Sequence, residues 1–479
     1  MALPIPHQFA PLQAVPLDGP RADAIAAAVP NRVAPYTQNF NLELQRELSR
    51  DLTLSVGYVG TKSTRLWNGV PLSAVDIFNN GFLDAFNTTR VGGNAKLFDD
   101  MLRGLNIPGA GVVNGTTVTG SAALRAYTST RGFIANGNVG QLADFLNRNT
   151  SITGKGGGFV RNSGMFPENF FVPNPQFNTV TLHGNLSNST YHALQAQLTK
   201  RLSRGFTSQT SYTWSRTLGA SDGDEVLNSR DPRNRALDKT LLNYHRTHNF
   251  TSNGTYELPF GPGRRLLGNA PGIVQRFVER WQFGGIFSWS SGVPLTITAP
   301  VSTITQLTTG TPALPFNTPT IVGDFPKNIG KVTKLPNAVT YFPGLQQITD
   351  PSAAGVTSLN GLSGQFSNKA ITDSQGHLLL VNPTPGQVGS LGLMWLEGPS
   401  RLGFDANLVK RVRITETKEF EFRVDAINVL NTPNFGFNTN RDTQNNPYLI
   451  NLSISSPDFG RFTDAQGSRR FTLGARLNF

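Results

Sequence analysis

The last nine residues of the chain, FTLGARLNF, alternate strictly between apolar and polar side chains. Successive side chains of an extended strand point to opposite faces, so the apolar members share one face: Phe471, Leu473, Ala475, Leu477 and Phe479. The wall of a transmembrane β-barrel requires this pattern, because each strand meets lipid on one side and a wet lumen on the other. The segment therefore predicts a closing barrel strand that ends on an aromatic residue.

The same alternation recurs upstream, in segments that are often paired across tight turns. The alternating segments are 38–48, 52–58, 191–202, 206–214, 249–258, 281–289, 402–408 and 420–426. Several exceed the five or six residues usual for soluble domains, and they suit a bilayer crossed at a tilt. We therefore expect an all-β fold, an antiparallel transmembrane β-barrel, to which this chain contributes roughly 10–14 strands of a larger barrel.

The connections between these segments are of two kinds. Residues 49–51 and 203–205 are tight turns, whereas residues 69–188 and 300–398 are very long connections. Short turns at one end and long loops at the other are typical of outer-membrane barrels, whose long loops are extracellular. Helical spacing of apolar residues in 95–105 and 140–147 predicts short helices that pack the first loop on itself, with a lid over a ligand as the alternative. We divide the chain into an irregular lead-in, 1–35, and a barrel region, 36–479.

Two further groups of side chains follow from a barrel. Aromatic residues near strand ends are candidates for interfacial girdles: Tyr58, Trp67, Tyr212, Trp214, Trp281 and Trp289. Charged residues opposite the apolar faces are candidates for the lumen: Glu43, Glu47, Glu419, Glu421, Arg423, Asp425, Arg470 and Arg476. We expect these charges to form an ion-pair ladder between neighbouring strands. A surface that holds a plug or guides a solute is the compatible functional alternative.

Composition excludes several classes of function. The chain has no cysteine, which removes disulfides and thiol catalysis and fits an exported bacterial protein. Its net charge is +12, but no run of five basic residues exists, and the aromatic residues lie in alternating strands rather than beside basic clusters. We therefore expect no nucleic-acid partner. Attraction to anionic lipid headgroups explains the positive charge better. No stretch of eighteen apolar residues predicts a transmembrane helix.

Motifs that would carry chemistry are missing. The glycines of 109–115 and 154–158 lack the spacing and context of a phosphate loop. The acidic turn at 222–225 lacks the third regularly spaced oxygen ligand and the later Glu of a calcium loop. If the segment that contains His245 and His248 is a strand, the two side chains lie on opposite faces and are not expected to share a metal ion. We predict no catalytic residues, no cofactor and no metal site, and hence no enzyme.

Several longer segments carry a family likeness. They are 36–66, TYHALQAQLTKRLSRGFTSQTSYTWSRT at 190–217, 231–264, GPSRLGFDANLVKRVRITETKEFEFRVDAINVLNTPNFG at 398–436, and FGRFTDAQGSRRFTLGARLNF at 459–479. In this order they resemble the C-terminal barrel region of Oar-like TonB-dependent receptors. The resemblance implies a barrel in the bacterial outer membrane that takes up or binds a bulky, unidentified ligand. It also implies contact with lipid and lipopolysaccharide, and recognition of the closing strand, with Phe479 last, by the barrel assembly machinery.

Receptors of this family begin with a signal peptide, a regulatory-like β domain, a TonB-contacting segment and a plug. No such parts are recognisable here, so we expect TonB to act only through a plug segment missing from this sequence, and the chain to be a piece of a longer receptor. A passive porin or a surface adhesin built on the same barrel is one alternative. A secreted, soluble all-β carbohydrate-binding or hydrolytic protein is another, and it predicts paired carboxylates among aromatic residues in one cleft.

Overall fold

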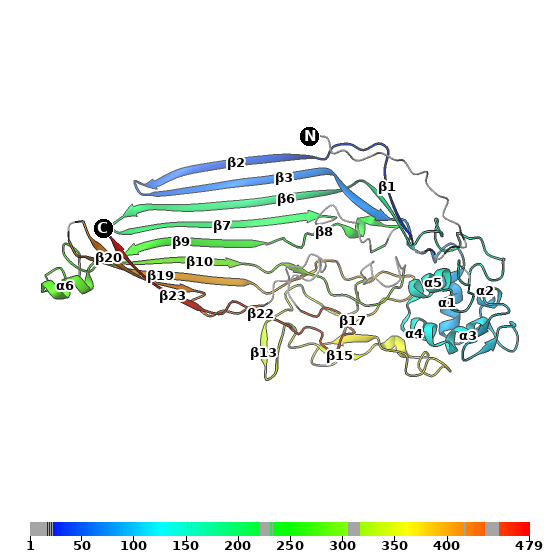
Figure 1. Cartoon of the computed structure of the whole chain (residues 1–479). Helices are drawn as coiled ribbons and strands as arrows, with labels where there is room; N and C mark the ends of the chain where they lie inside the picture. The colour runs from blue at the N-terminus through cyan, green and yellow to red at the C-terminus, as the bar shows by residue number, and fades with distance from the viewer. Residues whose placement is uncertain are drawn as a thin grey trace.

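Figure 1 shows the computed structural model of the chain. It describes residues 17, 19, 21, 23–154, 156–220, 230–231, 233–269, 271–304, 317–415, 417–435 and 450–479. Most of the lead-in and the acidic turn at 222–225 therefore lie outside the described residues.

A long antiparallel sheet, which we call the wall, dominates the described part of the chain (Figure 1). Its strands in spatial order are β2 (Tyr36–Ser49), β3 (Leu52–Pro71), β6 (Thr179–Ser203), β7 (Phe206–Gly219), β9 (His248–Glu257), β10 (Trp281–Ser290), β19 (Arg401–Arg413), β20 (Glu419–Ile427) and β23 (Arg470–Asn478). With β1 (Ala24–Ala28), parallel to β6, and β8 (Thr240–Leu241), beside β7, the sheet has eleven strands among the described residues. β2 and β23 are its two edges, so the wall is open rather than a closed barrel.

Every alternating segment of the sequence falls in a strand of the wall, but β3 and β6 run much further than the alternation does. They remain paired as far as Pro71 and Thr181, with register shifts between Ser63 and Asn68. Beyond the lipid band a strand has water or protein on both faces, so nothing selects for strict alternation. The end of the pattern near Tyr58 is therefore not the end of the strand.

The two ends of the wall differ as the sequence predicts. Tight turns join β2 to β3, β6 to β7 and β19 to β20, at the end where the C-terminus lies (Figure 1). Arg204 and Gly205 both have positive φ, 50° and 78°, which gives the two-residue hairpin turn its favoured twist. Asp51 links neighbouring turns, because it pairs with Lys200 and accepts a hydrogen bond from Ser203. β9 and β10 are joined at the same end by a longer connection with a short helix, α6 (Gly272–Val278).

The loop between β3 and β6 folds into a helical cluster. Its helices are α1 (Phe82–Arg90), α2 (Lys96–Met101), α3 (Gly120–Ala126), α4 (Thr128–Asn136) and α5 (Val139–Arg148), beside a small hairpin of β4 (Asn106–Ile107) and β5 (Gly111–Val112). Phe82 packs edge-on against Phe98 and Phe171, with ring centroids 5.6 Å and 4.9 Å away, and all three are fully buried. Two of these helices, α2 and α5, cover the helical segments expected from the sequence. Within the described ranges, every helix is too short or too polar to span a bilayer.

A second hydrophobic core forms in the loop between β10 and β19, together with residues 450–462. Short sheets surround it: β11 (Pro294–Leu295) with β18 (Leu396–Glu397), β13 (Thr333–Leu335) with β14 (Ala338–Thr340), β12 (Thr320–Ile321), β17 (Leu378–Val381), β16 (Lys369–Thr372) and β15 (Gln346–Thr349) in one sheet, and β21 (Asn434–Phe435) with β22 (Ala465–Gln466). The 3₁₀ helices are η1 (Arg235–Asp238) and η2 (Pro351–Ala353).

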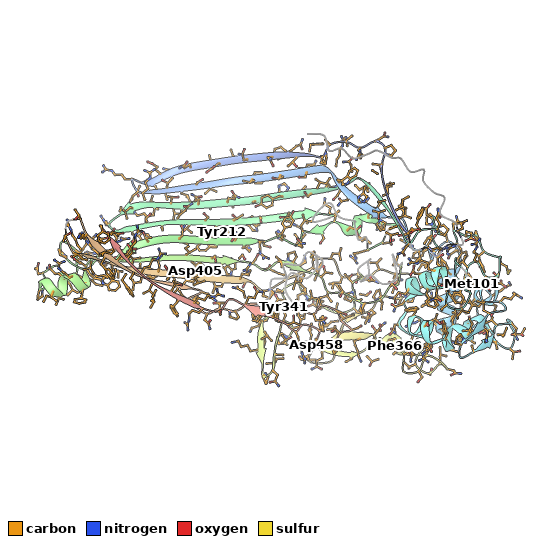
Figure 2. The ribbon with its side chains drawn as sticks, in the orientation of Figure 1. Met101, Tyr212, Tyr341, Phe366, Asp405 and Asp458 are labelled. Atoms are coloured by element: carbon orange, nitrogen blue, oxygen red, sulfur yellow. The ribbon has the colours of Figure 1, made fainter. Side chains whose placement is uncertain are left out.

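Hydrogen bonds join the two long loops. The Asn136 side chain donates to the carbonyl of Gln365 at 2.9 Å and accepts from the backbone N–H of Ser367 at 2.8 Å. The N–H of Gly140 donates to the carbonyl of Ser302 at 2.8 Å. The two loops therefore form one structure at one end of the wall, which we call the loop body (Figure 2).

Candidate functional site

One face of the wall carries a continuous apolar surface. The strand register places side chains of the same parity side by side, as in the row Phe283, Leu408, Val424 and Leu473. On β2, Leu42 and Leu44 belong to this face and are 67% and 72% exposed. Large leucines in such numbers would be costly in water. We call this face the lipid face, and all five apolar residues of the closing segment lie on it or at its end.

Aromatic side chains gather in two neighbouring rows near the loop-body end of the lipid face. Tyr58 and Trp214 lie in one row, separated by Leu194. Tyr212 and Trp289 lie in the next row, separated by Phe250. The register thus brings four of the six girdle candidates together, although they come from three distant segments of the sequence.

The other two girdle candidates lie elsewhere. Trp281 begins β10, eight residues before Trp289, which is about 27 Å along a strand. After allowance for strand tilt, that separation suits an apolar band about 25 Å tall with an aromatic border on each side. Trp67 lies in the extension of β3, where it stacks on His183 with 6.2 Å between ring centroids and lies under Arg32. Trp67 therefore lies outside both aromatic rows.

Two histidines join the aromatic rows, a role that was not predicted from the sequence. Hydrogen bonds link the Tyr58 hydroxyl to Nδ1 of His192 at 2.7 Å and the Tyr212 hydroxyl to Nδ1 of His248 at 2.8 Å. Gly60 makes room for the first pair, because a Cβ there would lie 2.7 Å from the Tyr58 hydroxyl. The sequence could have indicated the place of His192, because this residue precedes Leu194 by two positions in a strand and so lies on the same face.

The opposite face of the wall carries the predicted charges, and several of them pair across strands. Glu419 contacts Arg280 at 2.8 Å, and Arg411 contacts Glu421 at 2.8 Å and Glu419 at 3.8 Å. This chain of charges lies on strands β19 and β20 and at the start of β10, near the short-turn end. Arg280, Arg411 and Glu419 line a polar pocket of about 620 Å³ together with Glu257 and Gln282.

The remaining lumen candidates are more dispersed. Glu47 lies 3.6 Å from Arg201, Glu43 accepts a hydrogen bond from Ser55, and Arg423 contacts Asp425 at 2.7 Å. Arg476 is in register with Glu421, whereas Arg470 is in register with Ile427, and both arginines are exposed. Only part of the predicted set is therefore brought together as a ladder.

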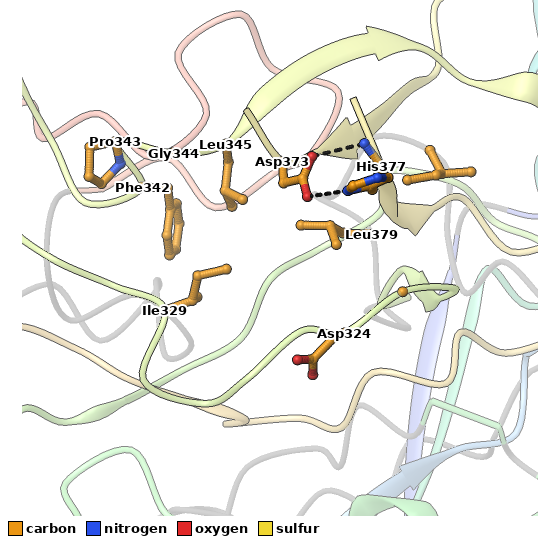
Figure 3. Close-up of a pocket in the computed structure, with 11 residues that line it drawn as sticks. Asp324, Ile329, Phe342, Pro343, Gly344, Leu345, Asp373, His377 and Leu379 are labelled. Carbon is orange, nitrogen blue, oxygen red and sulfur yellow. Dashed lines mark hydrogen bonds and ion pairs between the residues drawn. The ribbon is translucent and has the colours of Figure 1, made fainter. Parts of the chain in front are cut away.

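A pocket of about 540 Å³ opens in the loop body (Figure 3). Phe342, Ile329 and Leu379 give it apolar walls, and Asp324 lies across it from Asp373 and His377. An apolar cavity with a few polar groups is the usual form of a small-ligand site. Within the described residues, no cluster of three His, Asp or Glu side chains could hold a metal ion.

Asp373 owes its position to a turn. Its carboxylate accepts backbone N–H groups of Gln375 and His377, at 2.9 Å and 2.8 Å, and contacts Nδ1 of His377 at 2.9 Å. Desolvation opposes ionisation, but the bonds from His377 and Gln375 outweigh it and lower the pKa of Asp373. The pair therefore fixes the turn between β16 and β17, which leaves Asp324 as the acidic group directed at the pocket.

His245 lies outside the wall strands, in the connection that precedes β9, and is 4% exposed. The interpretation of this stretch as a strand is therefore wrong at His245, because β9 begins only at His248. Its Nδ1 accepts the backbone N–H of Thr217 at 3.3 Å, and its Nε2 lies 3.2 Å from the Thr247 hydroxyl. Burial, with the nearby Arg216 and Arg246, lowers the pKa of His245 to about 4.

This depressed pKa predicts that acid weakens the structure around His245. Between pH 6.5 and about 4 the unfolded state binds the extra proton, so stability falls as the pH decreases through that window. The loss is on the order of 3 kcal/mol at the acid limit. Urea unfolding in lipid vesicles at pH 7 and pH 4.5 measures it. His245→Asn, which keeps a donor and an acceptor but does not titrate, should remove this part of the slope; an unchanged slope would refute the assignment.

Comparison with known families decides the class of the molecule. A family model described as "Outer membrane beta barrel domain" matches residues 1–472. The chain belongs to this family. The all-β fold and the location in the bacterial outer membrane, both expected from the sequence, are thereby confirmed. No curated protein sequence matches the chain.

Solved structures give further likenesses. For the outer membrane transporter YddB from Escherichia coli, the TM-score is 0.36 at 7% identity, covering 95% of this chain and 34% of that one. For the ferripyoverdine receptor of the outer membrane of Pseudomonas aeruginosa, the TM-score is 0.30 at 8% identity, covering 93% of this chain and 27% of that one. The barrel chain thus spans about a third of the length of these structures or less.

Proposed function

We propose that the chain is the barrel region of an Oar-like TonB-dependent receptor that binds a bulky ligand at the cell surface for uptake. The observation that carries this proposal is the loop body. It has two hydrophobic cores, joined by hydrogen bonds, at the end of the wall with the long loops. Connecting strands needs only a few residues, so a folded structure of this size at the outer end supports a role in recognition.

The loop-body pocket suggests how a ligand is held. Phe342 and Ile329 offer apolar contact, and Asp324 offers a carboxylate that a hydroxyl or cationic group can meet. We propose that the pocket accommodates one part of a larger molecule. The protein acts by binding and translocation rather than by catalysis. We do not propose the secreted hydrolase, with its paired carboxylates, because the wall lies in a membrane.

The wall needs partners on both edges. An unpaired strand edge in hydrocarbon leaves backbone groups unsatisfied, at a cost of several kcal/mol each. We propose that β2 and β23 pair with further strands in the membrane, and that TonB acts through a plug that belongs to the same receptor. The barrel assembly machinery would read the closing strand, whose last side chain, Phe479, is 83% exposed.

We also propose contact with lipopolysaccharide at the outer border of the lipid face. Arg216 and Lys327 line a pocket of about 620 Å³ beside Tyr58 and Trp214. Cationic side chains above an aromatic row suit lipid phosphates. A nucleic-acid partner is not proposed.

The test compares cells that do and do not produce the protein, each with and without TonB, after incubation with a complex growth medium. Mass spectrometry of the medium and of washed cells identifies the compounds that are removed. A receptor removes and internalises a compound only when both the protein and TonB are present. Uptake without TonB would indicate a passive porin, and surface retention without internalisation would indicate an adhesin; either outcome contradicts the proposal.

A further inference from the structure

The connection between β9 and β10 differs from the other turns at its end of the wall. It contains α6, and no residue of this helix is buried. Ile273 and Phe277 are 78% and 72% exposed, and Val274 is exposed as well. Leu266 and Leu267, earlier in the same connection, are 50% and 53% exposed. So much apolar surface on so short a segment indicates a surface that something apolar covers.

Contacts of Trp281 place this helix at the border of the lipid face. The indole Nε1–H of Trp281 donates to the carbonyl of Phe277 at 2.7 Å. Trp281 is itself in register with Lys410 and belongs to the lipid-face parity of β10. Arg276 donates to the carbonyl of Arg413, which ties the helix to the end of β19. The helix and its exposed apolar side chains therefore lie beside the short-turn end of the lipid face.

Both acidic and basic residues lie around α6, whose C-terminal cap is Glu279. Arg264 and Arg280 are paired, with Glu257 and Glu419, each at 2.7–2.8 Å. Among the described residues, Arg265 and Arg276 form no ion pair with a carboxylate, and Arg276 spends one N–H on a neutral carbonyl. These two cations have no acidic partner within the described part of the chain and lie next to exposed leucine, isoleucine and phenylalanine side chains. This combination is suited to the surface of a bilayer, whose interior is apolar and whose headgroups are anionic.

We propose that α6 and residues 265–267 form an anchor in the periplasmic leaflet of the outer membrane. Ile273 and Phe277 insert among the first carbons of the acyl chains, and Arg265 and Arg276 contact the phosphates of anionic phospholipid. The short-turn end faces the periplasm in barrels of this layout, and that leaflet consists of phospholipid. The anchor is not part of a strand, but it sets the depth at which β9 and β10, the two strands that it connects, lie in the bilayer.

The absence of cysteine from the 479 residues allows a direct test. Phe277→Cys and Ile273→Cys, each in the whole protein as cells produce it, are labelled with a polarity-sensitive bimane and reconstituted in vesicles of phosphatidylethanolamine and phosphatidylglycerol. Val91→Cys is the matched control, because Val91 is also 72% exposed but lies in the loop body. Heat-modifiable migration in gels checks that each variant is folded.

The expected result is several-fold stronger quenching by phospholipid spin-labelled near the headgroup at positions 277 and 273 than at position 91, and weaker quenching when phosphatidylcholine replaces phosphatidylglycerol. Quenching by aqueous iodide as strong at 277 as at 91 would overturn the proposal. Protection from both quenchers would also overturn it, because a protein surface would then cover the helix. Lipid quenching that does not change with headgroup charge would refute the assignment to anionic phospholipid. None of these readouts depends on the transported ligand.

Discussion

Replacing Leu473 with arginine will lower the amount of folded protein in the outer membrane several-fold, whereas Thr472→Arg will leave it nearly unchanged. Leu473 is 69% exposed on the lipid face and lies six residues from the end of the chain, about 20 Å along the strand. An arginine near the middle of the bilayer costs about 2–4 kcal/mol on the lipid side of a barrel. The measurement is the heat-modifiable fraction in outer-membrane preparations.

The neighbouring substitution is the control because it adds the same charge to the same strand. Thr472 is in register with Asp425 on the opposite face, so an arginine there meets a carboxylate and water rather than lipid. If the two variants lose folded protein equally, the alternation of the closing strand does not reflect lipid on one side. The assignment of faces throughout the wall would then fail with it.

The change Phe82→Ala will unfold the helical cluster of the loop body without removing the wall from the membrane. Phe82 is fully buried and touches the rings of Phe98 and Phe171. Emptying such a site costs about 3–5 kcal/mol, which is a large share of the stability of a small cluster. Proteinase K added to intact cells should then cut within residues 82–172, which resist it in the unmodified protein.

Val91→Ala, at the end of the same helix, removes an apolar side chain that is 72% exposed and should leave the protease pattern unchanged. Heat-modifiability reports the wall separately. Continued resistance of Phe82→Ala to proteinase K would mean that the helices are not held by this core. Loss of the folded wall in that variant would mean that the wall depends on the loop body.

The wall could be predicted from the sequence because lipid imposes a pattern that single strands display. Leu42 and Leu44 alternate with Asn41 and Glu43 for that reason alone, and the structure pairs their strand, β2, with β3 across a tight turn. The extensions of β3 and β6 could not be predicted, since pairing outside the membrane leaves no alternation. Helices α1, α3 and α4 of the first loop were missed as well, because they are stabilised by contacts with one another rather than by their own sequences.

The candidate sites, too, could be predicted only in part from the sequence. Tyr58, Tyr212, Trp214 and Trp289 could be chosen as border aromatics from their places in alternating segments. Their grouping into two adjacent rows required the register. The loop-body pocket could not be foreseen, because Asp324, Phe342 and Asp373 meet only after three loop segments fold together. The roles of the lumen charges and of the border aromatics stay predictions.

The pairing of β3 with β6 also bears on the order in which the molecule folds. About a hundred residues separate the two strands, and closing a flexible loop of that length costs about 4 kcal/mol of chain entropy. If the helical cluster forms first, its packed core draws residue 72 and residue 178 together before the strands pair. The surface structure would then act as an internal template for assembly of the sheet, and destabilising it would slow insertion even where the final wall is equally stable.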